Sequence, residues 1–372
     1  MVRLPDRVRD VLEKISRDLS AQETVSGVGL FGSWSRGDAV PSSDVDLLIV
    51  DKRGLNYEYV ERIEFDGLLI DLNYVPKKWI TGVLPSEIDQ KLYEINVLYD
   101  RDWSLTNTKE WMSKSFRKPE RVDVRTETHL LESDMYLSRA ASAYAREDFQ
   151  SATVFAGMGM ESISKILMEV NLLPISNSRF MEALQKSAEK VGMPEIFTNY
   201  LNIAQLSGMD QQSVENKICL SRSVSEDVAS FMKDHPSEVE SLHFRVKTRL
   251  QYYGKPAFLQ GMIARCQAIS NLGAPIEASH YMFRTLMEIL ENYAWLASAV
   301  ERIRLDYTTL FRSLGNLKKS PARIYGNAIE AFNLKNTSRE EAERAIKSAK
   351  ENNLNLRRQR KNLIGNFVKS MV

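Results

Sequence analysis

The sequence predicts an α+β protein in which a small mixed β-sheet head is followed by a large all-α helical body. Short apolar runs separated by turn residues occupy residues 25–100, whereas stretches with helical periodicity fill the rest of the chain. A length of 372 residues exceeds the size at which a single hydrophobic core keeps growing. We therefore expect three domains: a head at residues 1–117, a helical bundle at 118–208 and a C-terminal helical domain at 209–372.

Four apolar runs of the head have the length of β-strands. Two of them, Tyr59–Phe65 and Leu68–Val75, flank Asp66 and Gly67, and Asp-Gly between apolar runs strongly indicates a two-residue hairpin. A third run, Val45–Val50, begins within an Asp-x-Asp pattern. Glu94–Asp100 is expected to be the last strand of the same sheet.

After residue 100 the chain is predicted to be helical, with proline and glycine between successive helices. The first five predicted helices are Ser104–Phe116, Glu120–Arg146, Phe149–Asn171, Arg179–Val191 and Glu195–Leu206. The third of these is rich in apolar and small residues, as is typical of a close-packed central helix.

Two longer helices are predicted near the C-terminus by apolar residues spaced alternately four and three apart. The first runs from about Ile276 to Leu314, with heptad positions at Met282, Leu286, Ile289, Tyr293, Leu296, Val300, Ile303, Tyr307, Leu310 and Leu314. Residues 342–367 keep the same spacing less regularly. We expect these two helices to pack side by side within the chain, and the alternative is the seam of a homodimer.

Two aspartates at the start of a predicted strand are the first candidate site residues. Asp44 and Asp46 are two positions apart, and residues i and i+2 of a strand face the same side with about 7 Å between their Cα atoms. Two carboxylates this close repel each other unless a cation lies between them. Hard oxygen ligands of this kind bind Mg²⁺ where it also holds the phosphates of a nucleotide.

A Gly-Ser pair precedes the aspartates and suggests a phosphate site. Gly32 has no Cβ, so backbone N–H groups there can approach a phosphate, and Ser33 adds a hydroxyl. Together the two patterns predict metal-dependent phosphoryl-group chemistry on a nucleotide. The structural alternative is that the aspartates only cap a strand beside a turn.

The string Gly-Ser-x-x-x-Gly-Asp, followed by Ser-Asp-x-Asp-Leu-Leu-Ile-Val, resembles the signature of the polymerase-β-like nucleotidyltransferase superfamily. It looks most like the branch that includes kanamycin nucleotidyltransferase and the minimal nucleotidyltransferases. The resemblance covers residues 25–100. It implies that Asp44 and Asp46 bind Mg²⁺ or Mn²⁺, and that Gly32 and Ser33 hold the β- and γ-phosphates of a nucleoside triphosphate.

The resemblance also implies a third metal-binding carboxylate on a neighbouring strand, and Asp71 lies in the second arm of the predicted hairpin. An unpaired carboxylate is costly to bury there, and a metal ion would remove that cost. Arg62 is the alternative partner, because the hairpin register places it opposite Asp71.

Three further polar residues lie near the signature. Arg36 follows the Gly-Ser pair and is placed to offset the charge of a triphosphate. Ser42 and Ser43 precede the aspartates, where they either donate to a phosphate or form the turn.

The reaction implied by the resemblance is attack of an acceptor hydroxyl on the α-phosphorus of a nucleoside triphosphate, with ATP as the expected triphosphate and pyrophosphate as the product. In kanamycin-type relatives a glutamate of the helical part removes the acceptor proton. Glu161, on an otherwise apolar helix, is the candidate, since burial would raise its pKa towards a useful range. The alternative is an ion pair with Lys165, one helical turn later.

Residues 134–206 faintly resemble the helical bundles, including the HEPN type, that accompany small nucleotidyltransferases. The Arg-to-His motif of HEPN ribonucleases is not found, because Arg125 and His129 are one residue too close together and precede the bundle. A ribonuclease function therefore has little support.

The charge of the chain gives little support for a nucleic-acid partner. The net charge is +1 at pH 7, and a protein-wide basic field is missing although residues 339–372 are basic. We expect a small-molecule or protein acceptor. The alternatives are an RNA-terminal nucleotidyltransferase and a nucleotide-binding regulatory or antitoxin-like protein that transfers nothing.

The chain shows no sign of membrane insertion or of a zinc site. No apolar run is long enough to span a bilayer, and the N-terminal segment has no hydrophobic signal region. Cys219 and Cys266 are far apart, with no Cys or His nearby. The expected location is the reducing cytoplasm.

Overall fold

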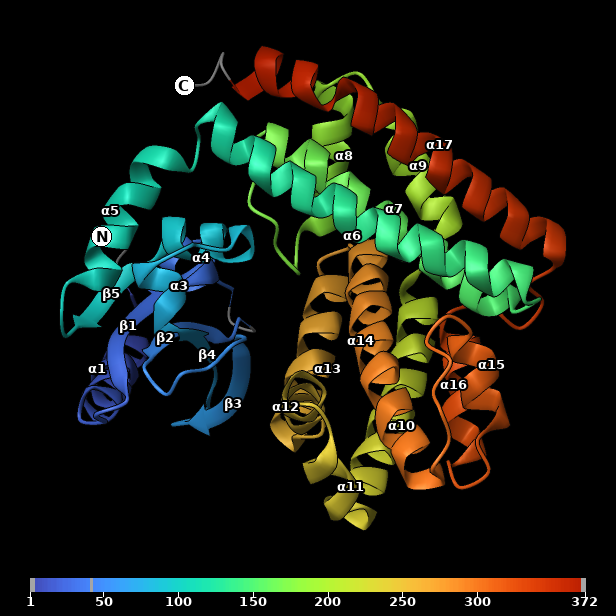
Figure 1. The fold of residues 1–372 in the computed structure, drawn as a ribbon, viewed down its shortest axis with the longest axis horizontal. Helices are drawn as coiled ribbons and strands as arrows, with labels where there is room; N and C mark the ends of the chain where they lie inside the picture. Colours follow the sequence, from blue (N-terminus) through green and yellow to red (C-terminus); the bar gives the residue numbers. More distant parts are fainter. Residues whose placement is uncertain (1–3, 41–42, 369–372) are drawn as a thin grey trace. The chain divides into compact units, whose positions relative to one another are not determined.

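The computed structural model describes residues 4–40 and 43–368, and it confirms the predicted α+β architecture (Figure 1). Residue contacts divide the chain into two units. The head unit comprises Met1–Phe116 and Lys247–Arg265, and the helical unit comprises Arg117–Val246 and Cys266–Val372. This division differs from the three predicted domains, because a segment from late in the chain belongs to the head and no boundary falls at residue 209.

The head contains a five-stranded sheet in the order β3-β4-β2-β1-β5. Its strands are β1 (Val25–Phe31), β2 (Val45–Asp51), β3 (Tyr59–Phe65), β4 (Leu68–Pro76) and β5 (Asn96–Asp100). The sheet is mixed, because β2 and β4 are parallel and every other neighbouring pair is antiparallel. Asp66 and Gly67 both have positive φ, at 50° and 68°, as a two-residue hairpin turn requires.

Helices pack apolar side chains against both faces of the sheet. On one face α1 (Asp6–Ser20) packs against alternate residues of β2, among them Val45 and Leu47. On the other face α3 (Lys77–Thr81), α4 (Asp89–Glu94) and α5 (Ser104–Ser115) cover Leu48 and Val50. Asp46 alternates in phase with Leu48 and Val50, so its side chain belongs to this second face.

Four shorter segments complete the head. They are α2 (Gly32–Arg36), η1 (Ser86–Ile88), the part of α12 (Phe244–Tyr253) from residue 247, and α13 (Pro256–Asn271) as far as residue 265. Residues 247–265 therefore bring side chains to the head from about 180 residues beyond the β3–β4 hairpin.

The helical unit is built around a buried central helix, as predicted. Its elements are α6 (Pro119–Ala145), α7 (Phe149–Val170), α8 (Phe180–Lys190), α9 (Pro194–Ile203), α10 (Gln211–Asp234), α11 (Pro236–Ser241), α14 (Pro275–Glu301), α15 (Leu310–Asn316), α16 (Ala322–Ala331), α17 (Arg339–Leu363) and η2 (Ile364–Val368). Every residue of α7 from Ser151 onward is buried, and α6, α8, α9 and α17 pack around it (Figure 1). None of the described helices is both long and apolar enough to cross a membrane.

The predicted helix from Ile276 to Leu314 was wrong in its last third. The helix α14 ends at Glu301, Arg302 takes a left-handed conformation with φ of 58°, and α15 begins only at Leu310. The heptad residues from Met282 to Val300 are buried within the chain itself. The two long helices do not pair as predicted, because α14 packs against α10 and α17 packs against α6 and α7.

Candidate active site

The register of the sheet brings the predicted carboxylates together. Asp46 on β2 and Asp71 on β4 are direct neighbours across the parallel pair, and Arg62 on β3 faces Asp71 from the other side. Asp44 lies one residue before β2 and shares the face of Asp46. The hairpin and the parallel pairing thus place three carboxylates and one guanidinium at one end of β2.

Arg62 joins two of these carboxylates. Its Nε and Nη2 donate to the two oxygens of Asp71, at 2.7 and 2.6 Å, and Nη2 also donates to Asp44 Oδ2 at 2.5 Å. The Arg62 residue is only 4% exposed. The alternative partner that the hairpin register offered for Asp71 is therefore present.

Residues 252–265 add further contacts to this cluster. Arg265 on α13 forms an ion pair with Asp44 Oδ1, and the Tyr252 hydroxyl donates to Asp71 Oδ2 at 2.9 Å. Lys255 donates to the Arg62 carbonyl at 3.0 Å. The sequence carries no local pattern that identifies these residues, since no motif connects them to the Asp-x-Asp signature.

Two neighbouring aromatic rings lie on one side of the Arg62 guanidinium. The rings of Tyr252 and Phe258 each have their centroid 5.4 Å from it, which is cation–π distance. Gly261 allows α13 to approach this closely. A Cβ at position 261 would lie 2.7 Å from Leu69 Cδ1 and 2.8 Å from Arg62 Nη1.

The three aspartates differ in their protonation behaviour although they are neighbours. Burial opposes ionisation of Asp44, but Arg265 and Arg62 outweigh it and hold its pKa below the usual value. Burial raises the pKa of Asp71 despite the hydrogen bonds from Arg62. Burial and the charges of Asp44 and Asp71 raise the pKa of Asp46 well above its usual value. Asp46 is thus the carboxylate whose charge is least compensated.

Three clustered carboxylates are suited by their chemistry to a divalent cation. In this structure Arg62 and Arg265 compensate the negative charge of two of them. The three carboxylates offer hard oxygen ligands, and Asp46 Oδ2 lies so close to Gly32 that a Cβ there would overlap it. Two guanidinium groups supply the charge that one divalent cation would supply. Among the described residues no three acidic, histidine or cysteine side chains are arranged to hold a metal as they stand. Arg62 forms ion pairs with both Asp44 and Asp71.

Residues 12–104 match the family model of the nucleotidyltransferase domain. The match includes Gly32, Ser33 and the three aspartates, and it does not extend into the helical unit. No curated protein matches the chain. The chain is similar to a nucleotidyltransferase-like protein from Exiguobacterium sibiricum 255-15 whose crystal structure is known. The two sequences are 11% identical, the match covers 88% of this chain and 89% of the other, and the TM-score is 0.30. An overall similarity this low carries no conclusion about function.

Within the matched region, described residues between Gly32 and Asp44 form hydrogen bonds with one another and with Glu94. Arg36 donates to Glu94 Oε2 at 2.7 Å and to Asp38 Oδ2 at 3.3 Å, so acidic residues already compensate its charge. The Ser43 hydroxyl accepts the N–H of Val40 at 2.9 Å, as in the turn role, one of the two roles that the sequence suggested for it. Ser42 lies outside the described residues. Gly32 has φ of 75° and begins α2, and Ser33 follows it in the first turn.

Glu161 lies in the helical unit and is held by cations. Its carboxylate is 3.2 Å from Lys165 Nζ and 3.0 Å from Arg284 Nε, and His280 Nε2 is 3.8 Å away. Burial favours the neutral acid, but Arg284 and Lys165 outweigh it and lower the pKa of Glu161. The expected rise in its pKa was therefore wrong, and the alternative ion pair with Lys165 is present.

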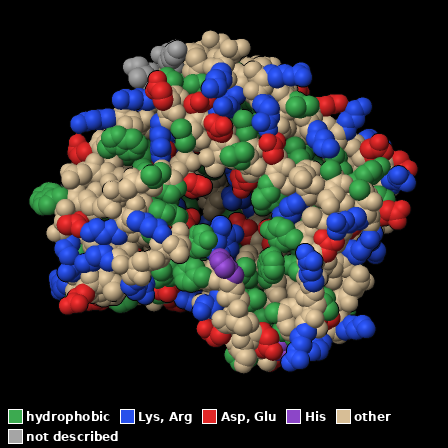
Figure 2. All heavy atoms as spheres, in the orientation of Figure 1, with side chains coloured by type: hydrophobic (Ala, Val, Ile, Leu, Met, Phe, Trp, Pro, Cys, Tyr) green, Lys and Arg blue, Asp and Glu red, His purple; other side chains and the backbone are tan. Residues whose placement is uncertain are grey.

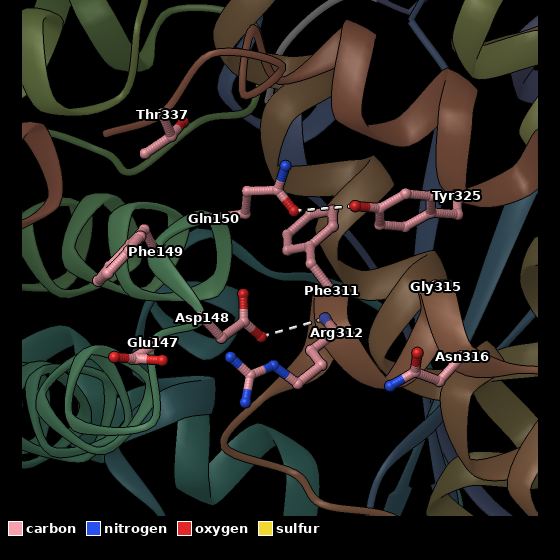
Figure 3. Close-up of a pocket in the computed structure, with 10 residues that line it drawn as sticks. All are labelled: Glu147, Asp148, Phe149, Gln150, Phe311, Arg312, Gly315, Asn316, Tyr325 and Thr337. Carbon is pink, nitrogen blue, oxygen red and sulfur yellow. Dashed lines mark hydrogen bonds between the residues drawn. The ribbon is translucent and has the colours of Figure 1, made fainter. Parts of the chain in front are cut away.

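A cavity of about 400 Å³ lies in the helical unit (Figure 3). Its lining residues are Glu147, Asp148, Phe149, Gln150, Phe311, Arg312, Gly315, Asn316, Tyr325 and Thr337. The Tyr325 hydroxyl donates to Gln150 Oε1 at 3.0 Å, and the Arg312 N–H donates to Asp148 Oδ2 at 3.1 Å (Figure 3). None of the predicted site residues lines this cavity, and no pattern in the sequence indicated it.

Proposed function

We propose that the protein is a metal-dependent nucleotidyltransferase, which transfers a nucleoside monophosphate from a nucleoside triphosphate to an acceptor hydroxyl and releases pyrophosphate. The observation that carries the proposal is the convergence of Asp44, Asp46 and Asp71 beside Gly32, inside a region that matches the nucleotidyltransferase domain. Positioning and charge compensation provide most of the acceleration in such transfers. A divalent cation held by the three carboxylates would provide both.

The roles follow from the position of each residue in the head. Asp44, Asp46 and Asp71 would hold Mg²⁺ or Mn²⁺, which when bound offsets phosphate charge and promotes ionisation of the acceptor hydroxyl. Gly32 and Ser33 would bind the β- and γ-phosphates, because Gly32 has no Cβ to keep a phosphate from its backbone N–H groups and Ser33 adds a hydroxyl. Arg36 and Ser43 would hold the loop between these two groups, as their hydrogen bonds indicate.

A small-molecule or protein acceptor is preferred to a nucleic acid. Basic and acidic side chains are interspersed on the face shown in Figure 2, and the chain has a net charge of +1. A polyanionic acceptor would favour a continuous basic surface. ATP as the donor nucleotide, the kanamycin-type branch and a cytoplasmic location remain predictions from the sequence.

The decisive test is a transfer assay that works before the acceptor has been identified. Each nucleoside triphosphate, labelled at the α- or the γ-phosphate, is incubated with Mg²⁺, the protein and separated metabolite, protein and RNA fractions of a cell extract. We expect label from the α-position, and none from the γ-position, to appear in the metabolite or protein fraction. Asp46→Asn should abolish this transfer, and near-normal turnover of that variant would refute the proposal.

A nucleotide-binding regulator is the second candidate function. The observation in its favour is that Arg62 and Arg265 already compensate the carboxylates. Such a protein would bind nucleotide but release no pyrophosphate with any of the fractions. Label in the RNA fraction alone would instead indicate an RNA-terminal transferase.

A further inference from the structure

We propose that the cavity of the helical unit is a binding site for a free aromatic amino acid (Figure 3). Its volume of about 400 Å³ falls within the range of small-molecule sites, which is about 300–1,000 Å³. All of its lining residues belong to the helical unit, and none of them lies in the region that matches the nucleotidyltransferase domain. This binding site is therefore additional to the proposed function of the head and does not depend on it.

Hydrogen bonds hold two walls of the cavity together. Asp148, which precedes α7, accepts hydrogen bonds from the N–H and the hydroxyl of Ser151, at 3.1 and 2.6 Å, and from the N–H of Arg312, at 3.1 Å. The Ser151 hydroxyl in turn accepts the N–H of Phe311 at 2.8 Å. These bonds join the first turn of α7 to the first turn of α15, so both walls are in place before a ligand binds.

Three other polar side chains of the lining are bonded within the protein. The Tyr325 hydroxyl donates to Gln150 Oε1 at 3.0 Å, and Gln150 Nε2 donates to the Leu334 carbonyl at 3.3 Å. The Thr337 hydroxyl donates to the same carbonyl at 3.1 Å. Like Asp148, these side chains already have partners, so the charge of a ligand must be matched by the remaining polar groups.

Glu147 and Arg312 are the charged lining residues that remain available to a ligand. Both are exposed, and within the described chain neither the Glu147 carboxylate nor the Arg312 guanidinium forms a hydrogen bond or a salt bridge. Arg339, which does not line the cavity, acts on Glu147 only through Coulombic attraction. Figure 3 shows the Arg312 side chain extending towards the Glu147 end of the cavity, where the two opposite charges lie without pairing.

These two charges define the ligand as a zwitterion. A guanidinium binds a carboxylate through two parallel hydrogen bonds, and a carboxylate binds an ammonium group through hydrogen bonds that are likewise charge-assisted. A ligand with negative charge alone, such as a phosphate, would be repelled by Glu147 and Asp148, and a ligand with positive charge alone would be repelled by Arg312. A free amino acid carries both charged groups on one carbon atom, so it can bridge Glu147 and Arg312.

Aromatic residues and a glycine select the side chain of the amino acid. Phe149, Phe311 and Tyr325 line the cavity, and aromatic rings pair favourably with one another. Gly315 leaves room beside Tyr325, because a Cβ there would lie 3.4 Å from the tyrosine ring, which is ordinary contact distance. An alanine therefore fits at position 315, whereas a longer side chain would take up space that the ring of the amino acid needs.

The test is isothermal titration calorimetry of the full-length protein with L-phenylalanine and with two analogues. Phenethylamine lacks the carboxylate, and 3-phenylpropionate lacks the ammonium group, so the analogues test both contacts on the unmodified protein.

Arg312→Gln and Glu147→Gln each remove one charge, and Arg312→Gln keeps the backbone N–H that Asp148 accepts. Their matched controls are Arg304→Gln and Glu330→Gln, which change exposed residues of the helical unit that do not line the cavity. Gly315→Leu fills the space beside Tyr325, and Gly315→Ala is its control. Circular dichroism confirms the fold of each variant.

We expect the unmodified protein to bind L-phenylalanine, and to bind each analogue about tenfold more weakly, the effect of one charge-assisted hydrogen bond. Arg312→Gln and Glu147→Gln should each weaken the binding of L-phenylalanine by the same factor. Arg312→Gln should leave the affinity for phenethylamine unchanged, and Glu147→Gln the affinity for 3-phenylpropionate, because each analogue lacks the partner of the removed group.

Gly315→Leu should abolish binding of L-phenylalanine, and the three control variants should bind it as the unmodified protein does. The proposal would be overturned if L-phenylalanine did not bind, if the analogues bound as tightly as L-phenylalanine, or if the control variants lost the same affinity. None of these outcomes would change the proposed function of the head.

Discussion

Arg62 and Asp71 face each other across the β3–β4 hairpin and share two hydrogen bonds, of 2.7 and 2.6 Å. Both side chains are almost completely buried, at 3% and 9% exposure. In this structure Arg62 thus compensates the negative charge of Asp71. A cation that bound Asp44 and Asp71 would have to compete with Arg62 for them.

Loss of this ion pair should destabilise the head. Arg62→Met leaves Asp44 and Asp71 without their shared partner, and removing one member of a buried pair costs about 3–5 kcal/mol. Urea denaturation should show that loss in the free energy of unfolding. The double variant Arg62→Met, Asp71→Asn should recover part of it, because the charge of Asp71 is then no longer buried without its partner. A further loss in the double variant would contradict the pairing.

The close approach of α13 to Arg62 predicts opposite effects of two glycine-to-alanine changes. At Gly261 a Cβ would lie 2.7 Å from Leu69 and 2.8 Å from Arg62, so Gly261→Ala should lower the free energy of unfolding by about 1–3 kcal/mol. Gly326, inside α16, has no heavy atom within 4 Å of its Cβ position. Gly326→Ala should raise that free energy by up to about 1 kcal/mol through helix propensity. Equal changes in the free energy of unfolding for the two variants would contradict the close approach of α13 to Arg62.

Glu277 should make stability depend on pH. Its buried carboxylate accepts the N–H groups of Met181 and Glu182, and burial outweighs these bonds and raises the pKa of Glu277 to about 7. The folded state holds the proton of Glu277 more tightly than the unfolded state does. The stabilisation of the folded state by this proton is therefore complete below about pH 4.5 and is lost as the pH rises through 7.

The matched variant for this prediction is Glu277→Gln, which keeps an acceptor oxygen but does not titrate. Relative to this variant, the free energy of unfolding of the natural protein should fall by up to about 3 kcal/mol between pH 4.5 and pH 8. Urea denaturation at several pH values measures the difference. A relative stability that rises with pH would show that the N–H groups, and not burial, dominate.

Glu161→Gln separates a structural role from a catalytic one. The carboxylate compensates Lys165 and Arg284, so its loss should lower the free energy of unfolding by about 3 kcal/mol. Once an acceptor is known, we expect the turnover of the folded variant and its pH profile to be unchanged. A large fall in turnover at unchanged stability would instead support the general-base role that the sequence suggested.

Structural features that depend on short-range sequence patterns were predicted correctly. Asp66 and Gly67 specified the hairpin, and the hairpin in turn fixed Arg62 opposite Asp71. The alternation along β2 placed Asp44 and Asp46 on one face. These features depend on neighbours in the chain or on a single hairpin register, which is why they could be predicted.

Contacts between distant segments could not be predicted in this way. Nothing near Tyr252 or Arg265 indicates that they bind aspartates about 180 or more residues earlier. Glu161 was assigned the wrong direction of pKa shift because Arg284 lies on another helix. The heptad pattern continued past Glu301 in the sequence, but a left-handed Arg302 ends the helix there, and spacing alone does not reveal such an end.

Asp44, Asp46 and Asp71 are proposed to form together the cation site for a nucleotide. Anomalous diffraction at the manganese absorption edge tests this proposal most directly, on crystals grown with Mn²⁺ and an α,β-methylene nucleoside triphosphate that cannot be cleaved. We expect an anomalous peak between the three carboxylates, with phosphates beside Gly32 and Ser33. A nucleotide bound elsewhere, or no peak at the aspartates while Arg62 and Arg265 keep their present ion pairs, would contradict it.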